Sequence, residues 1–142
     1  MSEVVIREAE DQDTDRLVEL IVELGHPITA AYVRPNLRAL RDMGLTPLVA
    51  EADDKLVGLC VPSIMHTLHR ETPVGRISTM VVDGHYRSHG IGALLVAEAE
   101  CRLAAKGCGL IEVTSNESRT RAHHFWEQMG YRHTSKRFAK SV

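Results

Sequence analysis

The chain has 142 residues and a formal net charge of −2 at pH 7, with 44% hydrophobic and 25% charged residues. These values predict one compact globular domain over residues 1–142 rather than a disordered chain. The near-neutral charge argues against a protein built mainly to bind nucleic acid. No apolar run reaches the roughly 18 residues that a membrane span needs, and the N-terminus lacks the layout of a signal peptide. The three cysteines, Cys60, Cys101 and Cys108, have no paired spacing, which favours reduced thiols in a cytoplasm.

Hydrophobic periodicity and turn residues predict an alternation of strands and helices. In chain order the pattern predicts a strand at 4–7, a helix that carries Leu17 to Leu24, a helical stretch at 29–43, strands at 47–52, 56–64 and 76–82, a helix at 91–106, a strand at 110–114, a helix at 120–129 and a last strand at 131–138. Pro35 either interrupts the second helical stretch or divides it into two pieces. The order is a mixed α/β layout.

The sharpest feature is the segment from Arg87 to Gly92, RSHGIG, which lies between a predicted strand and a predicted helix. The first N–H groups of a helix lack intrahelical partners and attract an anion such as a pyrophosphate. Glycines at 90 and 92 remove side chains that would hold phosphates away, and Arg87 adds a charge that can pair with phosphate oxygens. A P-loop would need Lys-Ser or Lys-Thr after the glycines, and the dinucleotide fingerprint would need a third glycine where Leu95 stands. The segment therefore predicts either another kind of phosphate-binding loop or a tight turn without a ligand.

Two blocks of the sequence resemble the Gcn5-related N-acetyltransferase (GNAT) superfamily. Residues 82–92, VDGHYRSHGIG, are similar to its acetyl-CoA signature, Arg/Gln-x-x-Gly-x-Gly/Ala after a strand that ends in valine. Residues 116–131 are similar to its second block, Asn-x-x-Ala-x-x-Phe-Tyr-Glu-x-x-Gly-Phe/Tyr. The element order and the length also match, so the resemblance covers nearly the whole chain. It implies a mixed, mostly antiparallel central sheet with two splayed parallel strands at the coenzyme site and helices on both faces.

The resemblance also implies the activity and the coenzyme site. The activity would be direct transfer of an acetyl group from acetyl-CoA to a primary amine of a small molecule, peptide or protein in a ternary complex. The end of the strand before the loop would pair its backbone with the pantetheine arm, and the N–H of Val82 would polarise the thioester carbonyl. Either Asn116 or Arg119 would touch the coenzyme, and Trp126 would pack along its arm. The implied coenzyme-binding residues are Met80, Val81, Val82, Arg87, Ser88, His89, Gly90, Ile91, Gly92, Ala93, Asn116, Arg119 and Trp126.

The catalytic groups depart from the family pattern. A lysine-like amine is mostly protonated at neutral pH, so a base has to take its proton. Many members carry a carboxylate on the strand ahead of the loop, where this sequence has Ser78 and Thr79. Glu112 matches a Leu-x-Glu-Val pattern in members that acetylate protein N-termini, where the glutamate is the base; the alternative is an ion-paired or solvent-facing strand glutamate. Trp126 stands at the position of the usual tyrosine acid and does not titrate usefully, and Tyr131 either substitutes for that acid or packs in the core.

The histidines do not predict a metal site. His66 and His69 lie in a predicted loop without a cysteine or carboxylate at zinc spacing. The adjacent pair His123 and His124 lies in a predicted helix, where neighbouring side chains point about 100° apart. No metal cofactor is therefore expected.

The acceptor is left open by the sequence. Loops on a rigid sheet commonly carry specificity, so the acceptor pocket is expected at residues 65–74 and 27–43. His69, Arg70 and Arg76 either attract an anionic acceptor or are solvated surface charges. Two other functions stay open, a non-catalytic acyl-CoA-binding module and an unrelated nucleotide-binding protein. Neither nucleic acid nor a membrane is expected as a partner, while the frequency of dimers among soluble proteins and in the resembled family favours a homodimer.

Overall fold

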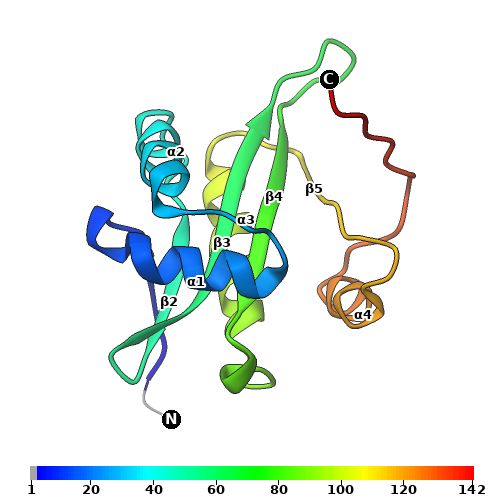
Figure 1. Cartoon of the computed structure of the whole chain (residues 1–142). Helices are drawn as coiled ribbons and strands as arrows, with labels where there is room; N and C mark the ends of the chain where they lie inside the picture. The colour runs from blue at the N-terminus through cyan, green and yellow to red at the C-terminus, as the bar shows by residue number, and fades with distance from the viewer. Residues whose placement is uncertain (1–2) are drawn as a thin grey trace.

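The computed structural model describes residues 3–142 and shows one sheet with helices on both of its faces (Figure 1). The strands are β1 (Val5–Glu8), β2 (Leu48–Ala52), β3 (Lys55–Met65), β4 (Val74–Val82) and β5 (Leu110–Val113). They lie side by side in chain order, and each neighbouring pair is antiparallel except β4 and β5, which are parallel. The expected mixed, mostly antiparallel sheet is thus confirmed.

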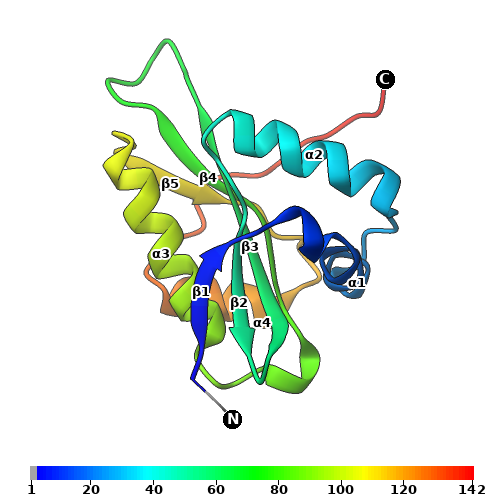
Figure 2. The same ribbon diagram turned by 90° about the vertical axis from the view of Figure 1, so that its left-hand side faces the viewer.

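The helices are α1 (Thr14–Leu24), α2 (Ala30–Asp42), α3 (Ile91–Ala105) and α4 (Thr120–Gln128), with short 3-10 turns η1 (Asp11–Asp13) and η2 (Gly84–Tyr86). Figures 1 and 2 show α1 and α2 on one face of the sheet and α3 on the other. Each face has its own core, and Trp126 of α4 joins the core beneath α3. None of the helices within residues 3–142 is long and apolar enough to cross a membrane.

Helix α3 confirms the stripe that periodicity predicted. Ile91, Leu95, Ala99 and Leu103 recur every fourth residue, and all four side chains are buried against the sheet. Gly58 of β3 lies directly below them, since a Cβ atom there would stand 2.8 Å from a Leu95 methyl group. The close contact fixes the helix over the centre of the sheet, and with it the loop that precedes the helix.

Two expectations about individual elements are settled by the structure. Residues 30–42 form one helix, so Pro35 does not divide it; the proline lacks an N–H and leaves only the Ala31 carbonyl without its usual partner. The predicted last strand at 131–138 is wrong. The backbone N–H of Tyr131 donates to Trp126, and residues 132–142 are exposed and pair with no strand among the described residues. Without a partner for its backbone groups, an extended segment does not become a strand.

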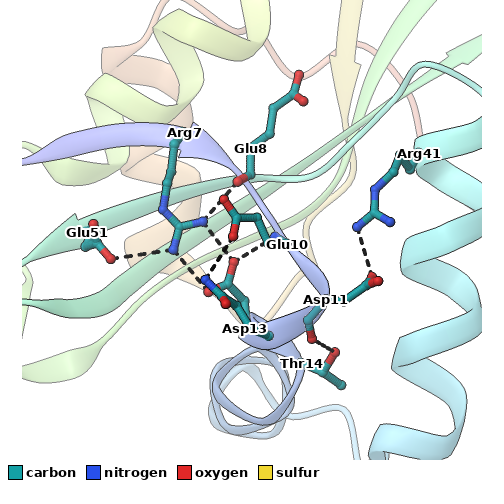
Figure 3. Close-up of polar contacts among 9 residues, drawn as sticks. Arg7, Glu8, Glu10, Asp11, Asp13, Thr14, Arg41 and Glu51 are labelled. Atoms are coloured by element: carbon teal, nitrogen blue, oxygen red, sulfur yellow. Dashed lines mark hydrogen bonds and ion pairs between the residues drawn. The ribbon is translucent and has the colours of Figure 1, made fainter.

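An ion-pair cluster ties β1 to the start of α1 (Figure 3). The Arg7 guanidinium donates to both carboxylate oxygens of Asp13, at 2.9 and 3.0 Å, and lies 3.5 Å from Glu51 of β2. The Glu10 N–H donates to the same Asp13 carboxylate at 2.7 Å. Burial opposes the charged form of Asp13, but these donors hold its pKa below the usual value. The cluster anchors the chain where it leaves the sheet edge and enters the first helix.

Candidate functional site

The site is organised around the point where β4 and β5 separate. The two strands pair only over Val74–Ile77 and Leu110–Val113. From Ser78 to Val82, the edge of β4 that faces β5 has no strand beside it among residues 3–142. The expected pair of splayed parallel strands is confirmed, and the separation leaves a length of main chain with free hydrogen-bonding capacity.

The main-chain groups on this open edge point outward. The register of β3 and β4 shifts at Ser78, which is an extra residue in β4 and bends the strand locally. On the closed side the Asp83 N–H donates to the Val57 carbonyl of β3 at 2.8 Å. Because the N–H groups of successive strand residues face opposite edges, those of Val82 and Met80 face the open side. Both residues belong to the predicted coenzyme-binding set.

The loop after β4 is held by a buried carboxylate. Asp83 is 3% exposed and accepts from the His85 N–H at 2.8 Å and from the Arg16 guanidinium of α1, with Lys55 at 3.7 Å. Burial opposes the charge of Asp83, but the His85 N–H and Arg16 hold its pKa below the usual value. Sequence reasoning did not select Asp83, although an aspartate directly after a strand and before Gly84 is a signal for a cap.

The end of α1 also contacts this loop. The Glu23 carboxylate accepts from the Gly84 N–H at 2.9 Å and lies 3.8 Å from the Arg87 guanidinium. The separation from Arg87 is longer than a hydrogen bond. Arg87 is half exposed and has room to pair with another anion.

The start of α3 offers unpaired N–H groups. Gly90, the residue before the helix, has φ of +77°, and no side chain caps the first turn. The N–H groups of Ile91, Gly92 and Ala93 therefore have no intrahelical partners. A Cβ atom on Gly92 would stand 3.1 Å from Phe125 and 3.2 Å from Met80, so glycine there lets α3, α4 and β4 meet closely. The structure brings this helix start next to the open edge of β4.

The predicted residues of the second block have separate environments. Asn116 closes a local turn by accepting from Ser118. Arg119 crosses to the other side of the site and donates to the Leu24 carbonyl at the end of α1. Trp126 is 7% exposed and lies in the core, edge-on to Phe125 and Tyr131 at ring-centre distances of 5.0 and 5.1 Å.

Tyr131 is bound to an acidic side chain away from the loop. Its hydroxyl donates to Glu100 of α3 at 2.8 Å. Burial, followed by the hydrogen bond to Glu100, raises the pKa of Tyr131 well above its usual value. The same core raises the pKa of the Cys60 thiol to about 12, mainly through burial. These groups are arranged for packing, which favours the core interpretation of Tyr131.

Glu112 lies on the face of the sheet that carries α1 and α2. Its neighbours Ile111 and Val113 pack into the core beneath α3, so Glu112 points to the opposite face. There its carboxylate lies 3.6 Å from Arg76, its register partner on β4. Its side chain is 40% exposed. The position suits a proton acceptor beside the open edge as well as an ion-paired strand residue.

The predicted histidine pairs do not assemble into a ligand set. Within residues 3–142, no three histidine, cysteine or acidic side chains come together as metal ligands would. His123 contacts the Asn116 carbonyl at 2.8 Å. The absence of a metal cofactor stays a prediction.

A splayed strand pair, followed by a loop and an uncapped helix start, defines the class of α/β acyltransferases that the sequence resembles. The sequence profile of the "Acetyltransferase (GNAT) family" matches residues 6–131. The aminoalkylphosphonate N-acetyltransferase of Salmonella typhimurium is 30% identical over 139 residues, which are 96% of this chain and 90% of that protein.

Solved structures give the same fold. An aminoglycoside N-acetyltransferase in complex with CoA superimposes with a TM-score of 0.90 at 18% identity, over 100% of this chain and 96% of that one. A protein described as a transcriptional regulator from Bacillus halodurans C-125 superimposes with a TM-score of 0.87 at 25% identity, over 99% and 100% of the two chains. The chain belongs to the GNAT family of acetyltransferases. Its activity is therefore transfer of an acetyl group from acetyl-CoA to an amine.

Proposed function

We propose that the protein transfers acetyl from acetyl-CoA directly to a small primary amine at the wedge between β4 and β5. The observation that carries the proposal is the open edge from Ser78 to Val82, which leads straight into the unpaired N–H groups at the start of α3. An extended amide-bearing arm can hydrogen-bond to such an edge like an added strand. A pyrophosphate matches the helix start. One continuous main-chain surface thus suits both parts of the coenzyme.

The residues of this chain fit acetyl-CoA in specific ways. The N–H and C=O groups of Met80 and Val82 would bind the arm. The loop and first turn from Arg87 to Ala93 would bind the pyrophosphate, with the Arg87 guanidinium adding charge-assisted hydrogen bonds. Val81 would keep the strand in place, since its side chain packs beneath α1 and α2.

The second block would close the site from its other side. Asn116 and Arg119 flank the mouth of the wedge, and Arg119 already reaches across to α1. Trp126 would support the arm indirectly, by holding Phe125 against Gly92. These assignments keep every residue of the predicted set near the coenzyme, with Trp126 in a packing role.

The chemistry needs one proton acceptor on the amine side. Acetyl-CoA supplies an activated thioester, whose acetyl carbon exchanges its bond to sulfur for a bond to the amine nitrogen. We propose that Glu112 receives the proton of the amine, directly or through water. Its carboxylate faces the α1 and α2 side of the sheet, which is the side where the acceptor pocket is expected. The outgoing thiolate takes a proton from solvent, since Trp126 does not titrate and Tyr131 is bound to Glu100. A main-chain N–H of β4, that of Val82 or Met80, would stabilise the oxyanion.

A small amine is the acceptor class that best fits the comparisons. The Salmonella relative is named for aminoalkylphosphonates, which are small amines. A protein N-terminus, which the Leu-x-Glu-Val pattern also allows, is the alternative acceptor. A thiol-release assay with both small amines and peptides distinguishes the two.

A matched pair of glycine variants tests the coenzyme site. Gly90 and Gly107 lie at opposite ends of α3, both with positive φ and both with open space where a Cβ would stand. Leucine at either position should cost a similar amount, about 1–2 kcal/mol, through the left-handed backbone. Only Gly90→Leu should also weaken CoA binding, by about tenfold or more, because its side chain would shield the first-turn N–H groups.

Calorimetric titration with CoA measures the difference between the two variants. Equal CoA affinity in Gly90→Leu and the wild type would overturn the proposed site. Thiol release with a panel of small amines and peptides then distinguishes the enzyme from a non-catalytic module, which would bind acetyl-CoA saturably without turnover. Competition by ATP or NAD, measured as a thermal shift, checks the unrelated nucleotide-binding function.

We also propose a homodimer in a cytoplasmic setting. β5 is the last strand of the sheet, and residues 132–142 extend from α4 without a partner among the described residues. Pairing of this segment with the β5 edge of a second copy would satisfy both sets of backbone groups. The cytoplasmic setting rests on the thiols at 60, 101 and 108, which are all free.

A further inference from the structure

The ion-paired arginines of this fold differ in how closely they are held by carboxylates. Arg7, Arg16 and Arg102 each donate to carboxylates at 3.0 Å or less, and each contacts a second oxygen group as well. These three guanidiniums hold structural elements together. Arg76 and Arg87 instead have one carboxylate each, at 3.6 and 3.8 Å, which is beyond hydrogen-bond length. Arg87 belongs to the coenzyme loop. Arg76 lies outside that loop and has the capacity to bind a second anion.

Arg76 lies at the vertex of the wedge on the face opposite α3. Its register partner is Glu112, and the next pair, Ile77 and Val113, is the last before the strands separate. Gly75 and Ile77, on either side of Arg76, face α3, so the Arg76 side chain emerges on the side of α1 and α2. It is 32% exposed there. Figure 1 shows that α1 crosses the lower part of β4 and that α2 lies on the β2 side of β3, so neither helix lies over the upper part of β4.

The distance along the strand suits a short molecule. Met80, whose N–H faces the open edge, is four residues beyond Arg76, or about 13 Å of extended strand. The bulge at Ser78 shortens this path, and the Arg76 side chain covers part of it. If the amino group of the acceptor lies beside the thioester, a group a few bonds away at the other end of the same molecule would therefore be within reach of the Arg76 guanidinium.

We propose, resting on the proposed acetyl transfer, that Arg76 is the acceptor's anion anchor and that the acceptor is a small zwitterion. Its phosphonate, phosphate or carboxylate group would pair with the Arg76 guanidinium, and its ammonium group would approach Glu112. A molecule with opposite charges a few bonds apart complements an arginine and a glutamate on neighbouring strands. Binding would replace the 3.6 Å contact between Arg76 and Glu112 with two closer ion pairs, one between the anion and Arg76 and one between the ammonium group and Glu112. The Glu112 carboxylate, no longer paired with Arg76, could then take the amine proton. An amine without an anionic group would leave the ion pair between Arg76 and Glu112 in place.

The test compares acceptors that differ only in the anion. Thiol release is measured for the full-length protein with 2-aminoethylphosphonate, β-alanine, ethanolamine and propylamine at saturating acetyl-CoA. The wild type should prefer the two zwitterions in kcat/KM by about 10- to 100-fold, the ratio typical of hydrogen bonds to charged groups. Arg76→Gln should remove that preference mainly by raising KM, while kcat/KM for the two amines without an anionic group changes less than about threefold. Arg76→Lys should restore part of it, because lysine keeps the charge without the guanidinium fork.

Lys106→Gln is the matched control for the loss of one positive charge. Lys106 is an exposed residue at the end of α3, on the face of the sheet opposite the Arg76 side chain. It should retain the wild-type preference. An equal loss of kcat/KM with the zwitterions and with the amines that lack an anionic group in Arg76→Gln, or a preference that survives in that variant, would overturn the proposal. CoA binding is measured in every variant, so that a failure of the coenzyme site is recognised separately.

A second measurement covers the outcome in which none of these amines is acetylated. Titration of 2-aminoethylphosphonate into the acetyl-CoA-loaded protein then reports acceptor binding directly. Binding by the wild type that is lost in Arg76→Gln supports the anion anchor, and the proposed transfer alone has failed. No binding by the wild type overturns the anchor, whatever the coenzyme affinity.

Discussion

Tyr131 shows how a single hydrogen bond separates packing from chemistry. Its hydroxyl is held by Glu100 at 2.8 Å, and its ring lies edge-on to Trp126 in the core. A phenol with a raised pKa can donate a proton in principle, but this one points to α3 rather than to the open edge of β4. Tyr131, the last residue of the second block, therefore acts by fastening the end of α4 to α3.

Tyr131→Phe is expected to keep kcat for acetyl transfer within about threefold of the wild type. It should lower the free energy of unfolding by about 1 kcal/mol, the usual net worth of one buried hydrogen bond. Steady-state thiol release and urea unfolding measure the two quantities. A fall in kcat by more than tenfold in a variant of unchanged stability would instead identify Tyr131 as the acid that protonates the thiolate.

At the scale of elements, the β1–α1 corner depends on a carboxylate with a lowered pKa. Asp13 is held by Arg7 and by the Glu10 N–H (Figure 3). Because its folded pKa lies below the unfolded value of about 3.9, the ion pair stabilises the fold above that pH. The contribution is lost as the pH falls through the folded pKa.

Asp13→Asn should therefore lower the free energy of unfolding at pH 7 by about 1–3 kcal/mol. The difference from the wild type should shrink steadily below pH 4. Urea unfolding between pH 7 and pH 3 follows both curves. Asp11→Asn is the control, because the contact of Asp11 with Arg41 is solvent-exposed and should matter little. A difference in the free energy of unfolding that is the same at every pH would show that Asp13 contributes through packing and neutral hydrogen bonds and not through its charge.

The elements also show what a sequence can and cannot reveal. The α3 stripe and the glycine loop were predictable because periodicity and backbone freedom are local properties. Pro35 could not be resolved because the packing of α2, which holds the helix together around it, is not local. The last strand was wrong because strand formation needs a partner, which no local pattern supplies. For the same reason the roles of Glu23 and Leu24 went unnoticed. Both reach the site from α1, Glu23 by a contact with Gly84 that spans 61 residues and Leu24 by one with Arg119 that spans 95.

At the scale of the whole molecule, the segment after α4 should decide the oligomeric state. Full-length protein is expected to have twice the 15.8 kDa mass of one chain. A chain that ends at Tyr131 should be monomeric, because the segment that would cover the β5 edge of a second copy is missing. Light scattering after size-exclusion chromatography measures both masses, and circular dichroism checks that the shortened chain still folds. A dimer that persists without residues 132–142 would place the interface elsewhere.

Within residues 3–142, the backbone–backbone hydrogen bonds of residues 114–131 join these residues to one another and not to the sheet. This final part is attached to the body through side chains, namely Arg119 on Leu24, Phe125 against Gly92 and Tyr131 on Glu100. A bound acetyl-CoA would lie between the body of the protein and the part beyond Val113. The amides of its arm could then form the main-chain hydrogen bonds that these two parts do not form with each other. The substrate would then complete the architecture, and rigidity of the part beyond Val113 would become a property of the loaded enzyme rather than of the polypeptide.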